Sequence, residues 1–269
     1  VNQVKNIIRK IEEQNIRGPK GELIRIEVFC HGALCMAVSG KCYLSLDNFN
    51  TSANRGACVQ PCRRGYTVQD RDKEITLAIE NEYIMSPKDL CTLPFLDKVL
   101  DAGVKILKIE GRGRSPEYTK VTVGVYSEAV KALQNGEFTE EKVAEWTERL
   151  RSVYNRDFWD GYYLGRKTGE WTQRYGSQAT KTKIFVGTVT NFFSKINVAE
   201  IRMETQDIKL GDNIMIIGPT TGVYEDKISE IRVDLQPVES TSKGELCSIP
   251  TKNVIRRGDK VYKVIDAEI

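Results

Sequence analysis

The stretch from Glu27 to Tyr66 constrains the fold of this chain most, because its cysteines have to be accommodated together. It holds five of the seven cysteines and the only histidine, His31. Four of these cysteines are irregularly spaced, with six, fifteen and three residues between neighbours: Cys35, Cys42, Cys58 and Cys62. A further cysteine, Cys91, closes the phrase MSPKDLC. We therefore expect four or more thiols to converge on one region of the folded chain.

Disulfides, a zinc site and an iron-sulfur cluster are the usual reasons for thiols at this density. The odd number of cysteines argues against a disulfide framework, as does the chain length, which is sufficient to bury a core; no secretory signal is visible. Zinc sites commonly pair their ligands as C-x2-C knuckles, and none of these spacings forms one. Irregular spacing suits a 4Fe-4S cluster, which needs only that four thiolates reach one cube. Zinc, and reduced core thiols without a metal, remain alternatives.

Four phrases carry a resemblance to known proteins: EVFCHGALCMAVSGKCYLS, SANRGACVQPCRRGY, EYIMSPKDLC and KILKIEGRGRSPEY. Through most of residues 22 to 180 the chain resembles the collagenase-like (U-type) peptidase family, and within it the bacterial tRNA hydroxylation (TrhP) subgroup. The resemblance implies a 4Fe-4S cluster on four cysteines. Those that match best are Cys35, Cys42, Cys58 and Cys91, with Cys62 as an alternative to Cys58 in the third place. Cys30 and Cys247 fall outside the motif and are expected to be core thiols.

The resemblance also implies a reaction. The expected function is an iron-sulfur-dependent tRNA hydroxylation that converts the wobble uridine to 5-hydroxyuridine, with the dianion prephenate as the hydroxyl donor. The alternatives are a peptidase acting on collagen-like substrates and a zinc-binding RNA adaptor without catalytic activity. The sequence has no H-E-x-x-H and no G-x-S-x-G, and a single histidine leaves little from which to build a hydrolytic site.

Length and charge set wider bounds. A chain of 269 residues should hold about two domains. No apolar run approaches the roughly 20 residues that cross a bilayer, so we expect a cytoplasmic protein. The net charge of +3 does not by itself indicate a polyanionic partner, so binding of tRNA has to come from local clusters of charge.

The elements expected in residues 1–178 alternate between strands and helices, which is typical of a parallel α/β sheet. Strands are expected over residues 23–29, 82–85 and 104–109. Helices are expected over residues 4–11, from Ser86-Pro87 to about Gly103, over 115–136 and over 139–153; residues 45–56 read as a long loop and 67–81 as a hairpin. Three strands cannot close an eight-stranded barrel, which takes about 250 residues. The region is therefore expected to be the C-terminal part of a TIM-like barrel whose other strands belong to an N-terminal region missing from this chain.

The pattern changes at about residue 179. From there to residue 269 the chain consists of short alternating apolar runs such as IFVGTVT and NIMIIG, separated by turn signals such as Leu210-Gly211-Asp212. This pattern predicts a small all-β barrel domain.

Three residues are candidates for acid-base chemistry. His31 follows a predicted strand, at the end where α/β folds carry their chemistry. Glu27 lies four residues earlier and, given a strand's period of two, on the same face, so it could orient or charge the ring. Glu110 follows the strand at 104–109 and could be a general acid or base. The structural alternatives are a hydrogen-bonded core histidine, and a Glu110 that only pairs with Lys108 or Arg112.

Basic residues gather in the predicted loops beside the cysteines. Guanidinium groups bind phosphates and carboxylates through paired hydrogen bonds. The candidates for binding an anionic substrate are Arg55, Arg63, Arg64, Lys108, Arg112 and Arg114. The Arg112-Gly113-Arg114 turn could hold one carboxylate of prephenate. A solvated surface with ordinary ion pairs is the alternative for each of them.

Overall fold

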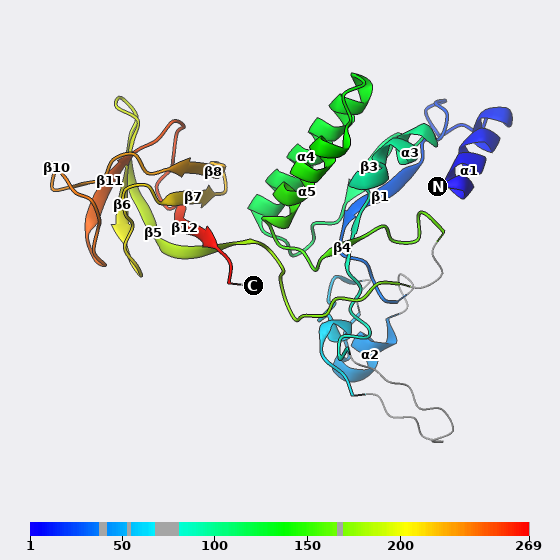
Figure 1. The fold of residues 1–269 in the computed structure, drawn as a ribbon, viewed down its shortest axis with the longest axis horizontal. Helices are drawn as coiled ribbons and strands as arrows, with labels where there is room; N and C mark the ends of the chain where they lie inside the picture. Colours follow the sequence, from blue (N-terminus) through cyan, green and yellow to red (C-terminus); the bar gives the residue numbers. More distant parts are fainter. Residues whose placement is uncertain (38–41, 53–54, 68–80, 166–168, 269) are drawn as a thin grey trace. The chain divides into compact units, whose positions relative to one another are not determined.

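The computed structural model describes residues 1–37, 42–52, 55–67, 81–165 and 169–268. The chain divides into two compact units (Figure 1). The first consists of Val1–Arg114 and Val121–Gln178, and the second of Ser115–Lys120 and Ala179–Ile269. The main boundary falls where the sequence changes to short alternating runs.

A four-stranded sheet, in the order β3-β1-β2-β4, is the centre of the first unit. β1 (Glu27–Gly32) pairs in parallel with β3 (Ile106–Ile109) and antiparallel with β2 (Asp89–Cys91). β2 in turn pairs in parallel with β4 (Phe158–Trp159). The sheet is therefore mixed, and the prediction of a purely parallel sheet is wrong. Membership of a larger TIM-like barrel remains a prediction.

Strand β2 accounts for the difference between the predicted parallel sheet and the observed mixed sheet. Residues 82–85 form a turn instead of the predicted strand, and Ser86-Pro87 does not begin a helix. Pro87 forms an isolated antiparallel bridge with Trp171, and β2 follows it. Proline holds the residue before it in an extended conformation. The buried run from Asp89 to Cys91 then continues as a strand into the core.

Helices pack against this sheet. Three of them lie close to the predicted ranges, whereas the helix predicted from Ser86-Pro87 to about Gly103 is confined to residues 93–101. α1 (Asn2–Glu13) packs Val4 and Ile8 against the core that surrounds α3 (Leu96–Asp101), which follows the short 3-10 helix η3 (Leu93–Phe95). α4 (Pro116–Gln134) and α5 (Glu140–Arg151) run side by side (Figure 1). The guanidinium group of Arg149 on α5 binds the carboxylate of Glu128 on α4 through two hydrogen bonds of 2.5 and 2.8 Å.

The cysteine segment lies between β1 and β2, and its described residues contain two short helices. α2 (Tyr43–Phe49) occupies part of the stretch for which a long loop was predicted, so that prediction is wrong for residues 45–49. The helix ends at Asn50, whose backbone is left-handed with a φ of 48°. A 3-10 helix, η2 (Pro61–Arg63), follows. Most of the hairpin predicted at residues 67–81 lies outside the described residues.

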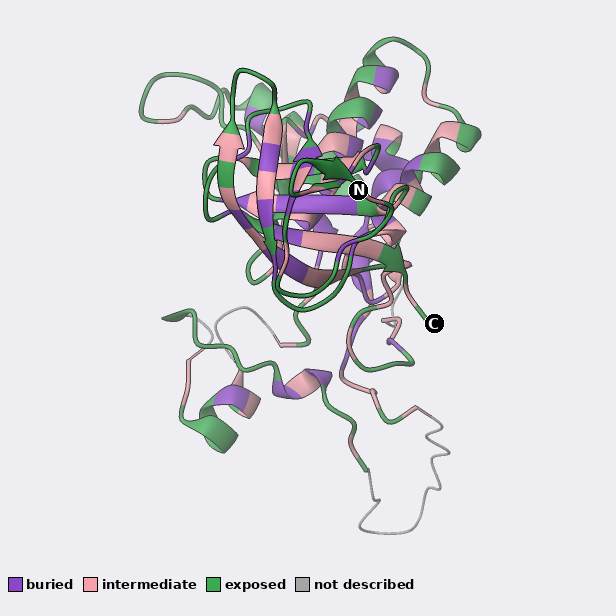
Figure 2. Ribbon diagram, turned by 90° about the vertical axis from the view of Figure 1, so that its left-hand side faces the viewer, coloured by how far each residue is buried: buried purple, intermediate pink, exposed green. Residues whose placement is uncertain are grey.

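The second unit is an eight-stranded antiparallel sheet in the order β10-β9-β11-β6-β5-β12-β7-β8. Its strands are β5 (Lys181–Phe193), β6 (Val198–Met203), β7 (Asn213–Gly218), β8 (Gly222–Lys227), β9 (Arg232–Val233), β10 (Gln236–Pro237), β11 (Leu246–Pro250) and β12 (Lys260–Asp266). Buried and exposed residues alternate along several of these strands (Figure 2). The predicted all-β region is confirmed.

Within the part of the chain that the structure describes, no helix is both long enough and apolar enough to span a membrane.

Candidate functional site

Four cysteine side chains line one pocket of the first unit, which we call the thiol pocket. Its volume is about 570 Å³, and its cysteines are Cys35, Cys42, Cys58 and Cys62. They come from three segments: the loop after β1, the residue that precedes α2, and the stretch from Cys58 into η2, which contains Cys62. The structure thus brings together thiols that are up to 27 residues apart in the sequence (62 − 35 = 27).

Two of these thiols carry perturbed pKa values. Burial raises the pKa of Cys62; the positive charge of Arg63 opposes this shift, and the other three pocket thiols add to it. Side-chain and backbone hydrogen bonds with Ser45 lower the pKa of Cys42, whose Sγ lies 3.6 Å from the Ser45 hydroxyl oxygen. The four thiols are therefore close enough to interact electrostatically. A bound cation would relieve the repulsion between their thiolates.

Cys91 lies elsewhere, in the core of the first unit. It is 3% exposed, pairs with His31 across the β1–β2 ladder, and has its Sγ 3.8 Å from the hydroxyl oxygen of Tyr126. Burial raises the pKa of Cys91 to about 11. The structure thus groups Cys62, and not Cys91, with the other three candidate ligands. Cys30 and Cys247 are buried, as predicted for core thiols.

The thiol pocket offers four thiol donors. Among the described residues, no three His, Cys, Asp or Glu side chains are placed so that they could hold one metal ion. In a 4Fe-4S cluster each thiolate binds a different iron atom, so the ligands stand further apart than they would around one ion. Four thiols around one pocket match this donor set in kind and number.

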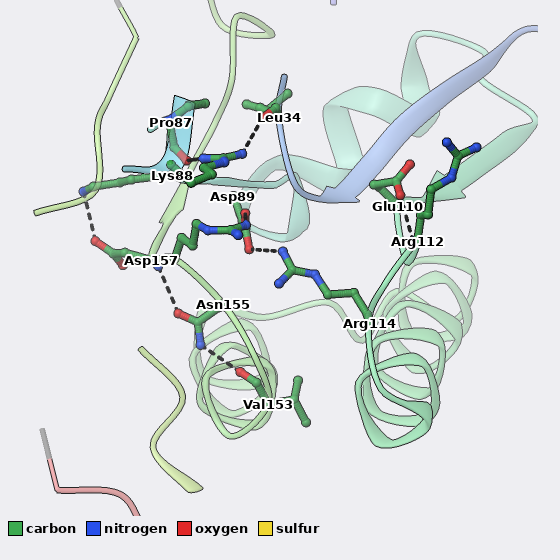
Figure 3. Close-up of polar contacts among 12 residues, drawn as sticks. Leu34, Pro87, Lys88, Asp89, Glu110, Arg112, Arg114, Val153, Asn155 and Asp157 are labelled. Atoms are coloured by element: carbon green, nitrogen blue, oxygen red, sulfur yellow. Dashed lines mark hydrogen bonds and ion pairs between the residues drawn. The ribbon is translucent and has the colours of Figure 1, made fainter. Parts of the chain in front are cut away.

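Next to the thiol pocket lies a buried ionic network centred on Asp89 (Figure 3). Asp89 is 1% exposed; one carboxylate oxygen accepts a hydrogen bond of 3.0 Å from Arg114, and the other lies 3.6 Å from the Arg156 guanidinium. Burial raises the pKa of Asp89, whereas Arg114, Arg156 and Arg63 lower it. Arg114 and Arg156 also stack on Tyr154, at 4.0 and 5.2 Å from the ring centroid.

Arg63 clamps the cysteine segment to the sheet. Its guanidinium donates hydrogen bonds to the backbone carbonyls of Leu34 at 2.6 Å and Pro87 at 2.5 Å, and to the Ser86 hydroxyl at 3.2 Å. Leu34 precedes Cys35, and Arg63 follows Cys62. One side chain therefore fixes two cysteine-bearing segments relative to the start of β2.

A second pocket, which we call the arginine pocket, adjoins the first. Its volume is about 340 Å³, and Cys58 lines both pockets. Four arginines and two tyrosines form much of its wall: Arg63, Arg64, Arg156, Arg174, Tyr154 and Tyr175. Because Arg63 directly follows Cys62, positive charge is concentrated next to the thiol pocket.

Only part of the predicted anion-binding set lies here. Arg63 and Arg64 line the arginine pocket, and Arg114 lies behind it in the Asp89 network. The remaining three, Arg55, Lys108 and Arg112, line neither pocket. Arg112 and Arg114 do not form a joint fork, because Arg114 points to Asp89 while Arg112 lies beside Glu110 (Figure 3).

The predicted acidic residues have structural partners. Glu27 forms a 3.0 Å ion pair with Lys108, and both side chains are about half exposed. Glu110 accepts a hydrogen bond of 2.8 Å from the backbone N–H of Arg112 (Figure 3), which stabilises the turn after β3. The idea that Glu27 shares a face with His31 is wrong, because a register shift between Phe29 and His31 interrupts the alternation of β1.

His31 itself is a buried residue of the strand. It is 2% exposed, and its ring packs against those of Tyr126 and Phe158, with centroid separations of 5.6 and 5.4 Å. Burial, with a smaller effect from the charge of Arg114, lowers the pKa of His31 to about 3. The imidazole is therefore neutral near pH 7 and is shielded from solvent, which makes it a poor general base toward a substrate.

The sequence analysis missed Asp89, Arg156 and Arg174. Asp89 is an acidic residue in an otherwise apolar strand, and such a residue needs a buried cationic partner. Arg156 stands in the polar phrase NRD, in the loop between α5 and β4. Loops held by a rigid sheet often carry functional residues. For Arg174 the sequence offers no comparable signal.

Comparison with known proteins identifies the family. Residues 2–173 match peptidase family U32. The chain belongs to this family. It is 56% identical to the collagenase of Porphyromonas gingivalis over 98% of its own length and 64% of that protein's.

Two other relatives carry a different name. The chain is 34% identical to tRNA hydroxylation protein P1 of Bacillus subtilis, over 84% of its own length and 54% of that protein's. It is 29% identical to tRNA hydroxylation protein P of Escherichia coli, over 79% and 55% of the two lengths. The chain thus spans between about half and two thirds of the length of these three relatives.

We expect Cys62→Ser to abolish cluster binding, whereas Cys91→Ser retains it. Protein purified without oxygen should carry about four irons and four sulfides per chain, and Cys62→Ser should reduce this to less than about one. Iron and sulfide analysis of both variants, with circular dichroism to confirm folding, makes the comparison. Loss of iron in Cys91→Ser but not in Cys62→Ser would contradict the grouping of thiols described above.

Asp89→Asn should destabilise the first unit by about 3–5 kcal/mol, because it leaves buried guanidinium groups without their counter-charge. All three tryptophans, Trp146, Trp159 and Trp171, lie in this unit, so urea denaturation followed by tryptophan fluorescence reports on it alone. Glu27→Gln, which breaks the half-exposed pair with Lys108, is the matched control and should cost less than about 1 kcal/mol. Equal losses of stability in the two variants would show that the Asp89 network contributes no more to stability than the exposed pair of Glu27 and Lys108.

The low pKa of His31 predicts a dependence of stability on pH. Below its ordinary pKa of 6.5 the unfolded chain binds a proton that the folded chain, with a pKa of about 3, does not bind. Stability should therefore fall as the pH falls from 6.5 toward 3, by about 2 kcal/mol at pH 5 from this group alone. Between pH 7.5 and 5 the free energy of unfolding of His31→Gln should fall by about 2 kcal/mol less than that of the parent protein. Parallel pH profiles of the two proteins would rule out this contribution.

Proposed function

We propose that this chain is part of an iron-sulfur enzyme that hydroxylates a base in tRNA. The observation that carries the proposal is the convergence of four thiols on one pocket, in a chain whose relatives at 34% and 29% identity are named tRNA hydroxylation proteins. In the proposal, Cys35, Cys42, Cys58 and Cys62 hold the cluster. A bound 4Fe-4S cluster would supply the redox chemistry that oxidation of a base carbon needs and that amino-acid side chains lack.

The residues around the thiol pocket have separable tasks in this proposal. Ser45 favours the thiolate of Cys42 through its hydrogen bonds, and Arg63 holds the Cys35 and Cys62 segments in place. Asp89 balances part of the arginine charge behind the pocket. The rings of His31, Tyr126 and Phe158 pack together in the core of the first unit and have no assigned task at the pocket.

We assign the wobble uridine as the target, 5-hydroxyuridine as the product and prephenate as the hydroxyl donor, on the strength of the family resemblance. The chain covers 64% and 54% of the length of two of its relatives, so this activity is proposed for the protein as a whole.

Peptide hydrolysis is the competing function, because the relative with 56% identity is named a collagenase. A hydrolytic site needs a general base or a metal-bound water. The chain's only histidine is buried with a pKa of about 3, which disfavours a site built on an imidazole base.

Deletion of the gene for this chain should remove 5-hydroxyuridine from total tRNA, as measured by nucleoside mass spectrometry. The unaltered gene should restore it, and the Cys62→Ser variant should not. Extracts of the same strains are tested in parallel for cleavage of denatured collagen. Unchanged 5-hydroxyuridine together with lost collagen cleavage would reject the hydroxylase in favour of the peptidase.

A further inference from the structure

One end of the second unit carries a cluster of positive charge. The tip of the hairpin between β5 and β6, residues 193–197, and the loop between β11 and β12, residues 251–258, lie at this end (Figure 1). The backbone N–H of Thr251 donates a hydrogen bond of 2.8 Å to the carbonyl of Asn197, which joins the two segments. We call them the basic end. They hold four basic residues and no aspartate or glutamate: Lys195, Lys252, Arg256 and Arg257.

The opposite end of the same unit has the reverse charge. Residues 204–212 and 238–245 adjoin there, and the backbone N–H of Leu210 donates a hydrogen bond of 2.9 Å to the carbonyl of Glu239. These two segments hold five acidic residues and two lysines: Glu204, Asp207, Asp212, Glu239, Glu245, Lys209 and Lys243. Positive charge is therefore separated onto one end of the unit, although the net charge of the whole chain is only +3.

Buried anchors fix the backbone of the loop at the basic end. Thr251, Ile255 and Asp259 are 6%, 1% and 2% exposed, and the side chain of Ile255 belongs to the core of the unit. A carboxylate oxygen of Asp259 accepts a hydrogen bond of 2.9 Å from the backbone N–H of Arg256. The residues between these anchors are thus presented to solvent on a backbone that is already ordered. A partner that binds them therefore pays little for ordering the loop.

Most of the positive charge at the basic end is not neutralised within the chain. Lys252 forms an ion pair of 2.8 Å with Asp226. Among the residues that the structure describes, the other three basic side chains form no ion pair, and all three residues are exposed: Lys195, Arg256 and Arg257. Such side chains can neutralise the phosphates of a polyanion, and the release of condensed counterions then favours binding.

Exposed apolar side chains alternate with these cations. Phe193, Ile196 and Val254 are 41%, 67% and 53% exposed. An exposed ring beside basic residues suits an unpaired base of RNA, which stacks on aromatic side chains. Binding within a membrane interface needs a continuous apolar face, whereas here polar and basic residues interrupt the apolar ones. The composition therefore favours a nucleic acid over a lipid surface.

We propose that the basic end binds the sugar-phosphate backbone of RNA. Lys195, Arg256 and Arg257 contact phosphates, and Phe193 stacks on an unpaired base. The choice of RNA among polyanions rests on the proposed function. None of these four residues lines the thiol pocket or the arginine pocket, so the surface binds RNA with side chains that are separate from the candidate site of the chemistry.

The test is a titration of the full chain into a fluorescently labelled, unmodified transcript of a tRNA, followed by fluorescence anisotropy at a series of KCl concentrations. We expect the logarithm of the association constant to fall linearly with the logarithm of the salt concentration. The double variant Lys195→Gln, Arg257→Gln should bind about tenfold more weakly or worse at about 0.1 M salt. It should also reduce the steepness of the salt dependence by about two, because two phosphate contacts are lost.

Phe193→Ala tests the stacking contact separately. It should weaken binding by about fivefold or more while leaving the salt dependence unchanged, because a ring that stacks on a base displaces no counterion. Phe193 and both lysine and arginine positions are exposed, so these variants should fold, which thermal unfolding of each protein checks.

The matched control is Lys209→Gln, Lys243→Gln, which removes the same charge from the opposite end of the same unit. It should leave both the dissociation constant and the salt dependence unchanged. Equal weakening in the two double variants, or no binding of the transcript by the parent chain, overturns the proposal. Binding of anionic phospholipid vesicles that the Lys195 and Arg257 substitutions abolish, while binding of the transcript is unaffected, assigns the surface to a membrane instead.

Failure of this proposal and failure of the proposed function are distinguishable. The titration needs no hydroxylation, and iron-loaded and iron-free protein should bind the transcript equally. Binding of the transcript that is insensitive to the Lys195 and Arg257 substitutions refutes only the basic end as the RNA surface. Unchanged 5-hydroxyuridine in the deletion strain, with RNA binding that depends on the basic end, refutes only the hydroxylase.

Discussion

The arrangement of both pockets depends on the hydrogen bonds of Arg63. A guanidinium group has five N–H donors in a fixed plane, so it can hold several acceptors in one geometry. Here it joins the loop after β1, through Leu34, to the residues before β2, through Ser86 and Pro87. These segments are more than fifty residues apart in the sequence (86 − 34 = 52). Their proximity brings Cys35 to the same pocket as Cys62, since each of these thiols lies next to a residue of the clamp.

The clamp requires a counter-charge, and Asp89 provides one. A buried arginine without a carboxylate in its surroundings would be strongly destabilising. Asp89 lies at the start of β2 and interacts with Arg114 from the turn after β3 and with Arg156 from the segment before β4. The ionic network therefore links the cysteine segment to β2, β3 and β4. Two of these side chains, Arg63 and Arg156, also line the arginine pocket, so scaffold and candidate site share residues.

Residue type alone was a poor guide to role in this chain. His31 and Cys91 carry chemistry-bearing side chains, but they face each other across the β1–β2 ladder in the core. Their neighbours are aromatic rings and the Tyr126 hydroxyl, so the histidine is neutral and the thiol is shielded. The alternation of a strand failed to predict this because a register shift at Phe29 to His31 changes which side each residue faces. Glu27 consequently pairs with Lys108, whereas the sequence analysis expected it to lie beside the imidazole of His31.

The sequence by itself determined those features that depend on near neighbours along the chain. The apolar periodicity of α1, α4 and α5 predicted these helices, the alternation after residue 179 predicted the β-sheet unit, and the dense cysteines between Glu27 and Tyr66 marked the candidate site. Tertiary structure decided the rest: the antiparallel β2, Cys62 in place of Cys91 in the thiol pocket, and Arg156 and Arg174 in the arginine pocket. The physical reason is that helical and strand patterns repeat every few residues, whereas a pocket is assembled by contacts between distant segments, such as that of Arg156 with Gln60.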